Sequence, residues 1–201
     1  MKTLRRLVLL LPFATALPLA AQNGKPDAEG FIRDWLVLAP LFVDESGTEE
    51  IDKQQLATEA KPAAKEGATE TIGRLTLTWR KVATKDFYID FRELHPKDFE
   101  HVAAWAVAYV VAAEEKKGLT LRMNSNDQGK VYLNGQQVVK FTDTRTLEKD
   151  AEDSAPNVTL RKGVNVVVLK VINEENNWQG SVRFVDAAGK PVTDLKIETK
   201  P

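Results

Sequence analysis

The chain has 201 residues, of which 28 are basic and 29 are acidic, and it contains no cysteine. This composition excludes a disulfide scaffold, a thiolate zinc site and a cysteine nucleophile. The formal net charge is −1 and there is no basic block, which argues against nucleic-acid binding driven by phosphate neutralisation. The length is sufficient for one domain with its own hydrophobic core.

Residues 1–21 have the features of a secretory signal peptide. A short basic stretch precedes an apolar stretch at residues 7–20, and Ala20 and Ala21 supply small residues for cleavage. The apolar stretch is about 14 residues long, which is too short to span a bilayer. We therefore expect a secreted or periplasmic protein of residues 22–201 with no membrane insertion. Without the three basic residues of the leader, its net charge is −4.

The mature chain opens with an apolar segment and continues with an acidic one. Residues 31–42 predict a buried strand, because the run is apolar and Pro40 excludes a helix there. Residues 44–70 hold no aromatic side chain and are rich in acids. They predict a long solvated loop with one helical turn near residues 49–59; an acidic recognition loop is the alternative.

Residues 71–113 contain sequence patterns that are typical of β-strands. Residues 71–79 and 87–91 are rich in aromatic and β-branched side chains, as is typical of strands. Residues 102–113 are ambiguous, because their alanines favour a helix while Trp105, Val107, Tyr109 and Val111 recur with the period of a strand.

The strongest local signal is a hairpin. Asn134-Gly135 separates two alternating runs, and both residues tolerate positive φ in a two-residue turn. This register places Tyr132 opposite Gln137 and Val131 opposite Val138, so that Val131 and Val138 face the core and Tyr132 faces the other way.

The remainder of the chain also predicts strands. Residues 142–156 form an acidic loop, residues 164–173 a central valine-rich strand, residues 178–185 another strand, and residues 192–197 the last. Short strands at regular spacing, separated by turns, are typical of an antiparallel β-sandwich or barrel. We expect one all-β domain over residues 22–201.

Four segments in order resemble the galactose-binding-like jelly-roll modules of secreted bacterial proteins. They are residues 34–41 (DWLVLAPL), 124–135 (NSNDQGKVYLNG), 160–165 with 169–171 (LRKGVN and LKV), and 178–184 with 189–192 (WQGSVRF and GKPV). The resemblance implies a jelly-roll sandwich with a carbohydrate-binding surface and makes residues 102–113 a strand. Asn124 and Asn126 stand where glycine and aspartate are usual, which lowers the charge available to a calcium ion. No metal or other cofactor is predicted.

No catalytic pattern is apparent. His95 and His101 are the only histidines, and neither lies in a metal-ligand or nucleophile motif. Pairs of acids such as Asp90 and Glu93 are expected by chance on a chain with 28% charged residues. The sequence therefore predicts a protein that is not an enzyme.

Sugar recognition pairs an aromatic face with short polar side chains that hold hydroxyls. The candidate ligand-binding residues are Tyr132, Trp178, Asn124, Asn126 and Asp127. Tyr132 could instead pack under a neighbouring loop, Trp178 could belong to the core, and the Asn and Asp residues could serve the turn alone. Trp35, Trp79 and Trp105 are predicted to lie in the core.

Two hypotheses follow. The first is a non-catalytic module that binds carbohydrate, and the second is a structural or protein-interaction sandwich without a sugar site. The expected partners are a glycan or a cell-envelope protein, and the net charge of −4 favours a neutral glycan or a protein surface over an anionic polymer.

Overall fold

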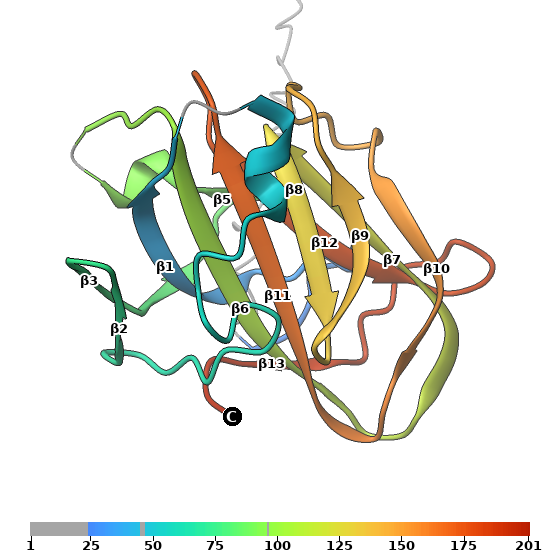
Figure 1. Ribbon diagram of the computed structural model, residues 1–201. Coiled ribbons are helices and arrows are strands. Elements are labelled where there is room, and N and C mark those ends of the chain that lie inside the picture. Colours follow the sequence, from blue (N-terminus) through green and yellow to red (C-terminus); the bar gives the residue numbers. More distant parts are fainter. Residues whose placement is uncertain (1–23, 45–46, 96) are drawn as a thin grey trace, which may run out of the picture.

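The computed structural model describes residues 24–44, 47–95 and 97–201, so the predicted signal peptide lies outside the described residues. Two antiparallel sheets pack face to face (Figure 1). The larger sheet has the order β4 (Arg80–Ala83), β1 (Asp34–Phe42), β6 (Val102–Ala112), β11 (Gly163–Asn173), β8 (Gln128–Leu133) and β9 (Gln136–Phe141), and β13 (Lys196–Glu198) also pairs with β6. The smaller sheet has the order β10 (Asp153–Leu160), β7 (Lys116–Asn126), β12 (Gln179–Val185) and β5 (Ile89–Asp90). The predicted all-β, antiparallel class is confirmed.

Four short elements lie outside these sheets. Strands β2 (Thr69–Ile72) and β3 (Leu75–Thr78) form a separate hairpin, and two 3₁₀ helices, η1 (Gly47–Asp52) and η2 (Arg92–Leu94), lie in the connections.

Strand β6 settles the ambiguity of the alanine-rich run. Ala104, Ala106 and Ala108 point into the core between the two sheets, whereas Trp105 and Val107 point to the opposite face of the larger sheet. Both faces of this central strand are buried, which explains why the run is apolar throughout instead of alternating with polar residues. Trp35, Trp79 and Trp105 are buried, as predicted.

The Asn-Gly hairpin forms with one difference from the predicted register. Asn134 and Gly135 have positive φ, and Tyr132 pairs with Gln137 as expected. Val131, however, pairs with Val139, because the register shifts between Val131 and Tyr132. The prediction that Val131 opposes Val138 is therefore wrong. Val139 packs in the core beside Val131, and Tyr132 lies on the other face, as predicted.

The acidic segment is not simply a solvated loop. Residues 49–64, here called the cover, lie over the outer face of the larger sheet beside β8 and β11 (Figure 1). Ile51, Leu56 and Ala64 are buried there in a second apolar cluster that includes Trp79 and Trp105. These three apolar side chains, spaced among the acids, contribute to docking the segment, because each is removed from water against the sheet.

The last predicted strand is shorter than expected. Residues 192–197 are mostly irregular, and β13 is confined to Lys196–Glu198, where it pairs with β6. Val192 and Ile197 still contribute to the main core.

Candidate functional site

Trp178, a candidate ligand-binding residue for which the core was the alternative, is buried in the structure. Its side chain has no exposed surface, and its ring lies 5.1 Å from that of Phe91 and stacks against His95 at 6.3 Å. The segment carrying β5 and η2 supplies these two rings and covers the tryptophan. Trp178 is therefore a core residue and offers no face on which a sugar could stack.

Asp127 is a scaffold residue in the loop between β7 and β8. Its carboxylate accepts hydrogen bonds from the backbone N–H groups of Arg145, Glu174 and Glu175, at 3.3, 2.9 and 3.4 Å. Burial raises the pKa of this carboxyl, while the three backbone donors act in the opposite direction. The side chain thus ties three loops together at one end of the sandwich.

The two asparagines before it are buried as well. Asn124 accepts a hydrogen bond from the backbone N–H of Ser125 and donates one to the Glu148 carbonyl. Asn126 is 5% exposed, and its Oδ1 has no hydrogen-bond partner among the described residues. The expectation that these residues present hydroxyl-binding groups on an open surface is therefore wrong for Asn124.

Asn126 and Asp127 nevertheless reach the edge of a polar hollow of about 550 Å³ at this end of the sandwich. Three loops and the 3₁₀ helix η2 surround it, and none of its lining residues is aromatic. They are Arg92, Asn126, Asp127, Thr144, Arg145, Thr146, Glu175, Asn176 and Asn177. We call it the loop-end hollow.

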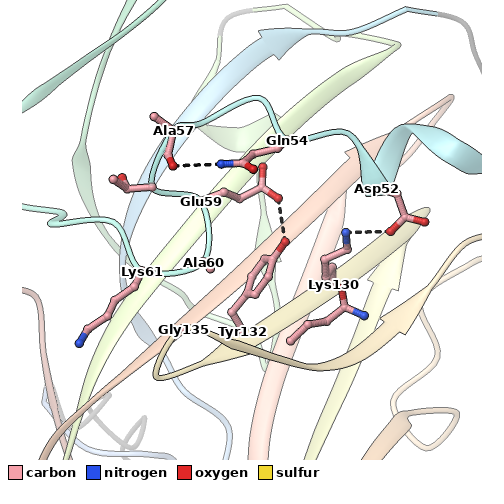
Figure 2. Close-up of a pocket in the computed structure, with 11 residues that line it drawn as sticks. Asp52, Gln54, Ala57, Glu59, Ala60, Lys61, Lys130, Tyr132 and Gly135 are labelled. Carbon is pink, nitrogen blue, oxygen red and sulfur yellow. Dashed lines mark hydrogen bonds and ion pairs between the residues drawn. The ribbon is translucent and has the colours of Figure 1, made fainter.

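Tyr132 lies in a second hollow, between the cover and the β8–β9 hairpin, with a volume of about 630 Å³ (Figure 2). The cover and the hairpin each contribute polar side chains around the tyrosine ring. The lining residues are Asp52, Gln54, Ala57, Thr58, Glu59, Ala60, Lys61, Lys130, Tyr132, Gly135 and Gln137. We call it the Tyr132 hollow. Of the five predicted ligand-binding residues, Tyr132 is the one that lies here, half-buried.

The hydroxyl end of the tyrosine is anchored to the cover. Tyr132 donates a hydrogen bond of 2.9 Å to Glu59 Oε1, and Figure 2 shows the ring pointing toward this carboxylate. The alternative that Tyr132 packs under a neighbouring loop is thus partly right. The cover contacts the hydroxyl, while the ring lines the hollow. Burial and the nearby Glu59 carboxylate raise the pKa of Tyr132, so its hydroxyl stays protonated and remains a donor.

Glu59 forms an ion pair with Lys170, a residue of β11 with no exposed surface. The Lys170 Nζ lies 3.2 Å from Glu59 Oε2 and also donates to Gln55 Oε1 at 2.5 Å and the Lys53 carbonyl at 2.7 Å. Burial lowers the pKa of Lys170, and the Glu59 carboxylate acts against that shift. This ammonium group connects the central strand to the underside of the cover.

A second ionic group forms the other wall of the hollow. Asp52 accepts hydrogen bonds from Lys130 at 2.9 Å and from Lys140 at 2.7 Å. These two lysines, Lys140 first, lower the pKa of the Asp52 carboxyl. The Lys130 Nζ also lies 5.9 Å from the centre of the Tyr132 ring, so positive charge is present directly beside the aromatic surface.

Sequence reasoning did not identify Asp52, Glu59, Lys130 or Lys170. Lys170 interrupts a valine-rich strand, and a lysine inside a buried strand signals a paired charge, because lysine is almost never fully buried without a partner. The identity of its partner has no sequence signal, since Glu59 is 111 residues away.

The described residues give no indication of a metal centre or a membrane span. Across 24–44, 47–95 and 97–201, no group of three or more histidine, aspartate or glutamate side chains is placed to hold a metal ion. Within the same ranges, no helix has the length and apolar character needed to cross a bilayer.

Comparison with known proteins adds one structural likeness. No protein-family model matches the chain, and no curated protein matches its sequence. One similar solved structure is a PA14 sugar-binding domain from an RTX adhesin, with 8% identity and a TM-score of 0.38. The likeness covers 82% of this chain and 96% of that domain.

Proposed function

We propose that this chain is an exported, non-catalytic module that binds carbohydrate in the Tyr132 hollow. The observation that carries the proposal is the placement of a half-buried tyrosine ring in an open hollow lined by amides, a hydroxyl, carboxylates and lysines (Figure 2). Saccharides are amphipathic: their C–H faces pack on aromatic rings while their hydroxyls bind short polar groups.

The groups around Tyr132 suit this role. Gln137 carries an amide that can both donate and accept, and Thr58 carries a hydroxyl. The NH2 group of Gln54 donates to the Leu56 and Ala57 carbonyls, so Gln54 offers a ligand its side-chain oxygen as an acceptor. The tyrosine ring itself is fixed at its far end by Glu59, so a sugar would meet a surface that is already ordered. Pre-ordering of this kind lowers the entropic cost of binding.

The connectivity supports the resemblance to galactose-binding-like jelly rolls. From β6 to β8, and again from β9 to β12, consecutive strands pass from one sheet to the other. Export is supported by the leader-like residues 1–21, and is tested by expressing the full chain in a bacterial host and sequencing the N-terminus of the exported protein. A new N-terminus at Gln22 is the expected result.

The binding test uses residues 22–201 on a glycan array, with and without calcium. Tyr132→Ala removes the ring and is expected to abolish binding, whereas Tyr132→Phe keeps the ring and is expected to retain it. Thr146→Ala, in the loop-end hollow, is the matched control and should bind as the wild type does. Binding that survives Tyr132→Ala but is lost in Thr146→Ala would move the site to the loop-end hollow.

The second candidate function is a protein-interaction sandwich without a sugar site. The burial of Trp178 favours it, because this residue was the other predicted stacking platform. Absence of binding to every glycan on the array, with folded protein, would support this function and overturn the first.

A further inference from the structure

The charges around the Tyr132 hollow are unevenly distributed. Its two carboxylates, Asp52 and Glu59, are both engaged by cations of the protein itself. Asp52 is shared by Lys130 and Lys140, while Glu59 is paired with Lys170 and also accepts the Tyr132 hydroxyl. Neither carboxylate therefore presents a free negative charge to a ligand.

Lys61 is the exception among the lining lysines. It is exposed, it lines the hollow, and within the described part of the chain it makes no ion pair. Figure 2 shows Lys61 and Lys130 on opposite sides of Tyr132. The lining thus holds two lysines against two carboxylates, and of these four charged groups Lys61 is the one that makes no ion pair within the described residues.

The unpaired charge of Lys61 is opposite in sign to the net charge of the mature chain. In a chain of net charge −4, an ammonium group without an ion-pair partner in the lining of a hollow attracts a ligand carboxylate locally, although the whole-chain charge disfavours an anionic ligand. The whole-chain charge predicts a neutral glycan, whereas the hollow itself favours an acidic one.

We propose that the ligand of the Tyr132 hollow is an acidic saccharide, in which a sugar ring lies against Tyr132 and a uronic-acid carboxylate meets the Lys61 ammonium. This inference rests on the proposed function, because it names the class of carbohydrate that the hollow takes. Lys130 contributes positive potential beside the ring, and Gln137 provides an amide for the sugar hydroxyls.

The test compares oligomers of galacturonic acid with galactose oligomers of the same length and linkage, by titration calorimetry of residues 22–201. The acidic oligomer is expected to bind about fivefold more tightly, as one solvent-exposed ion pair provides, and its advantage should shrink as salt is added. Lys61→Gln should remove most of the advantage, so that the acidic and the neutral oligomer bind the variant with similar affinity. Lys190→Gln, a change of another exposed lysine, is the matched control and should leave both affinities unchanged.

The outcomes separate this inference from the proposed function. Equal affinity for the two oligomers, lost in Tyr132→Ala, would overturn the acidic ligand while leaving carbohydrate binding in place. Tighter binding of the acidic oligomer that is unaffected by both Lys61→Gln and Tyr132→Ala would also overturn the inference, because the ligand would then bind elsewhere. Binding of neither oligomer, nor of glucuronic-acid and glucose oligomers tested in parallel, would remove both proposals.

Discussion

The Tyr132 hydroxyl donates a 2.9 Å hydrogen bond to Glu59 Oε1 and so joins strand β8 to the cover, 73 residues earlier in the chain. The same carboxylate is paired with the buried Lys170 ammonium. One residue of the cover therefore connects the candidate binding surface to the central strand of the larger sheet. A substitution of Lys170 should consequently have a measurable effect at Tyr132, and a substitution of Tyr132 a measurable effect at Lys170.

Tyr132→Phe should separate the tyrosine's anchoring role from its stacking role. Loss of the hydroxyl removes one hydrogen bond to a carboxylate that Lys170 still neutralises, so the free energy of unfolding should fall by only about 1 kcal/mol. Urea denaturation measures this change, and calorimetry with the bound saccharide measures retention of the ring's contribution. A loss of binding as large as that of Tyr132→Ala would show that the hydroxyl, rather than the ring, contacts the ligand.

Lys170→Met should loosen the cover. Removing the ammonium leaves Glu59, which is 3% exposed, as a buried carboxylate without its cation, at a cost of about 3–5 kcal/mol. Hydrogen exchange should report lost protection in residues 49–64, and Trp105, whose ring lies 5.7 Å from the Lys170 Nζ, should change its fluorescence. Lys140→Met, which breaks a partly exposed pair with Asp52, is the control and should cost less than about 1 kcal/mol. Equal effects of the two variants would contradict the buried role of Lys170.

Asp127→Ala should act on stability and not on the Tyr132 hollow. The change deprives the backbone N–H groups of Arg145, Glu174 and Glu175 of their acceptor, which should cost about 2–3 kcal/mol. The midpoint of thermal unfolding measures this loss, while saccharide affinity is measured at a temperature where the variant is still folded. Loss of affinity with unchanged stability would restore Asp127 as a ligand-binding residue.

His95 should make the fold sensitive to mild acid. Burial, and secondly the positive charge of Arg80, lowers the pKa of His95 below its ordinary value of 6.5, and the ring packs against Trp178 and Phe99. The unfolded chain therefore binds the proton more tightly than the folded one. The stability that the neutral ring contributes is complete above about pH 6.5 and is lost as the pH falls from there toward the folded-state pKa.

The measurement is the urea midpoint between pH 7.5 and pH 5, in the wild type and in His95→Phe. The phenylalanine variant cannot titrate at this position, so its midpoint should fall less over the range. Parallel curves for the two proteins would show that His95 does not contribute to the pH dependence.

Much of the sandwich could be predicted from local pattern. Alternation of apolar and polar residues located the strands, and Asn134-Gly135 located the hairpin, because both signals depend on neighbouring residues only. The alanine-rich β6 could not be assigned from periodicity, because both of its faces are buried and the alternation is absent. Val131 was paired one residue away from its actual partner, because a register shift leaves no trace in composition.

The sequence by itself determined the strand-rich class, the absence of cysteine chemistry, the turn at Asn134-Gly135 and the burial of Trp35, Trp79 and Trp105. Only the tertiary structure decided that the acidic segment covers a sheet face, that Trp178 is enclosed, and that Tyr132 meets Glu59. Those outcomes depend on contacts between residues tens to more than a hundred positions apart. Whether a charged or aromatic side chain is exposed is set by what packs over it, and chain spacing carries no information about that partner.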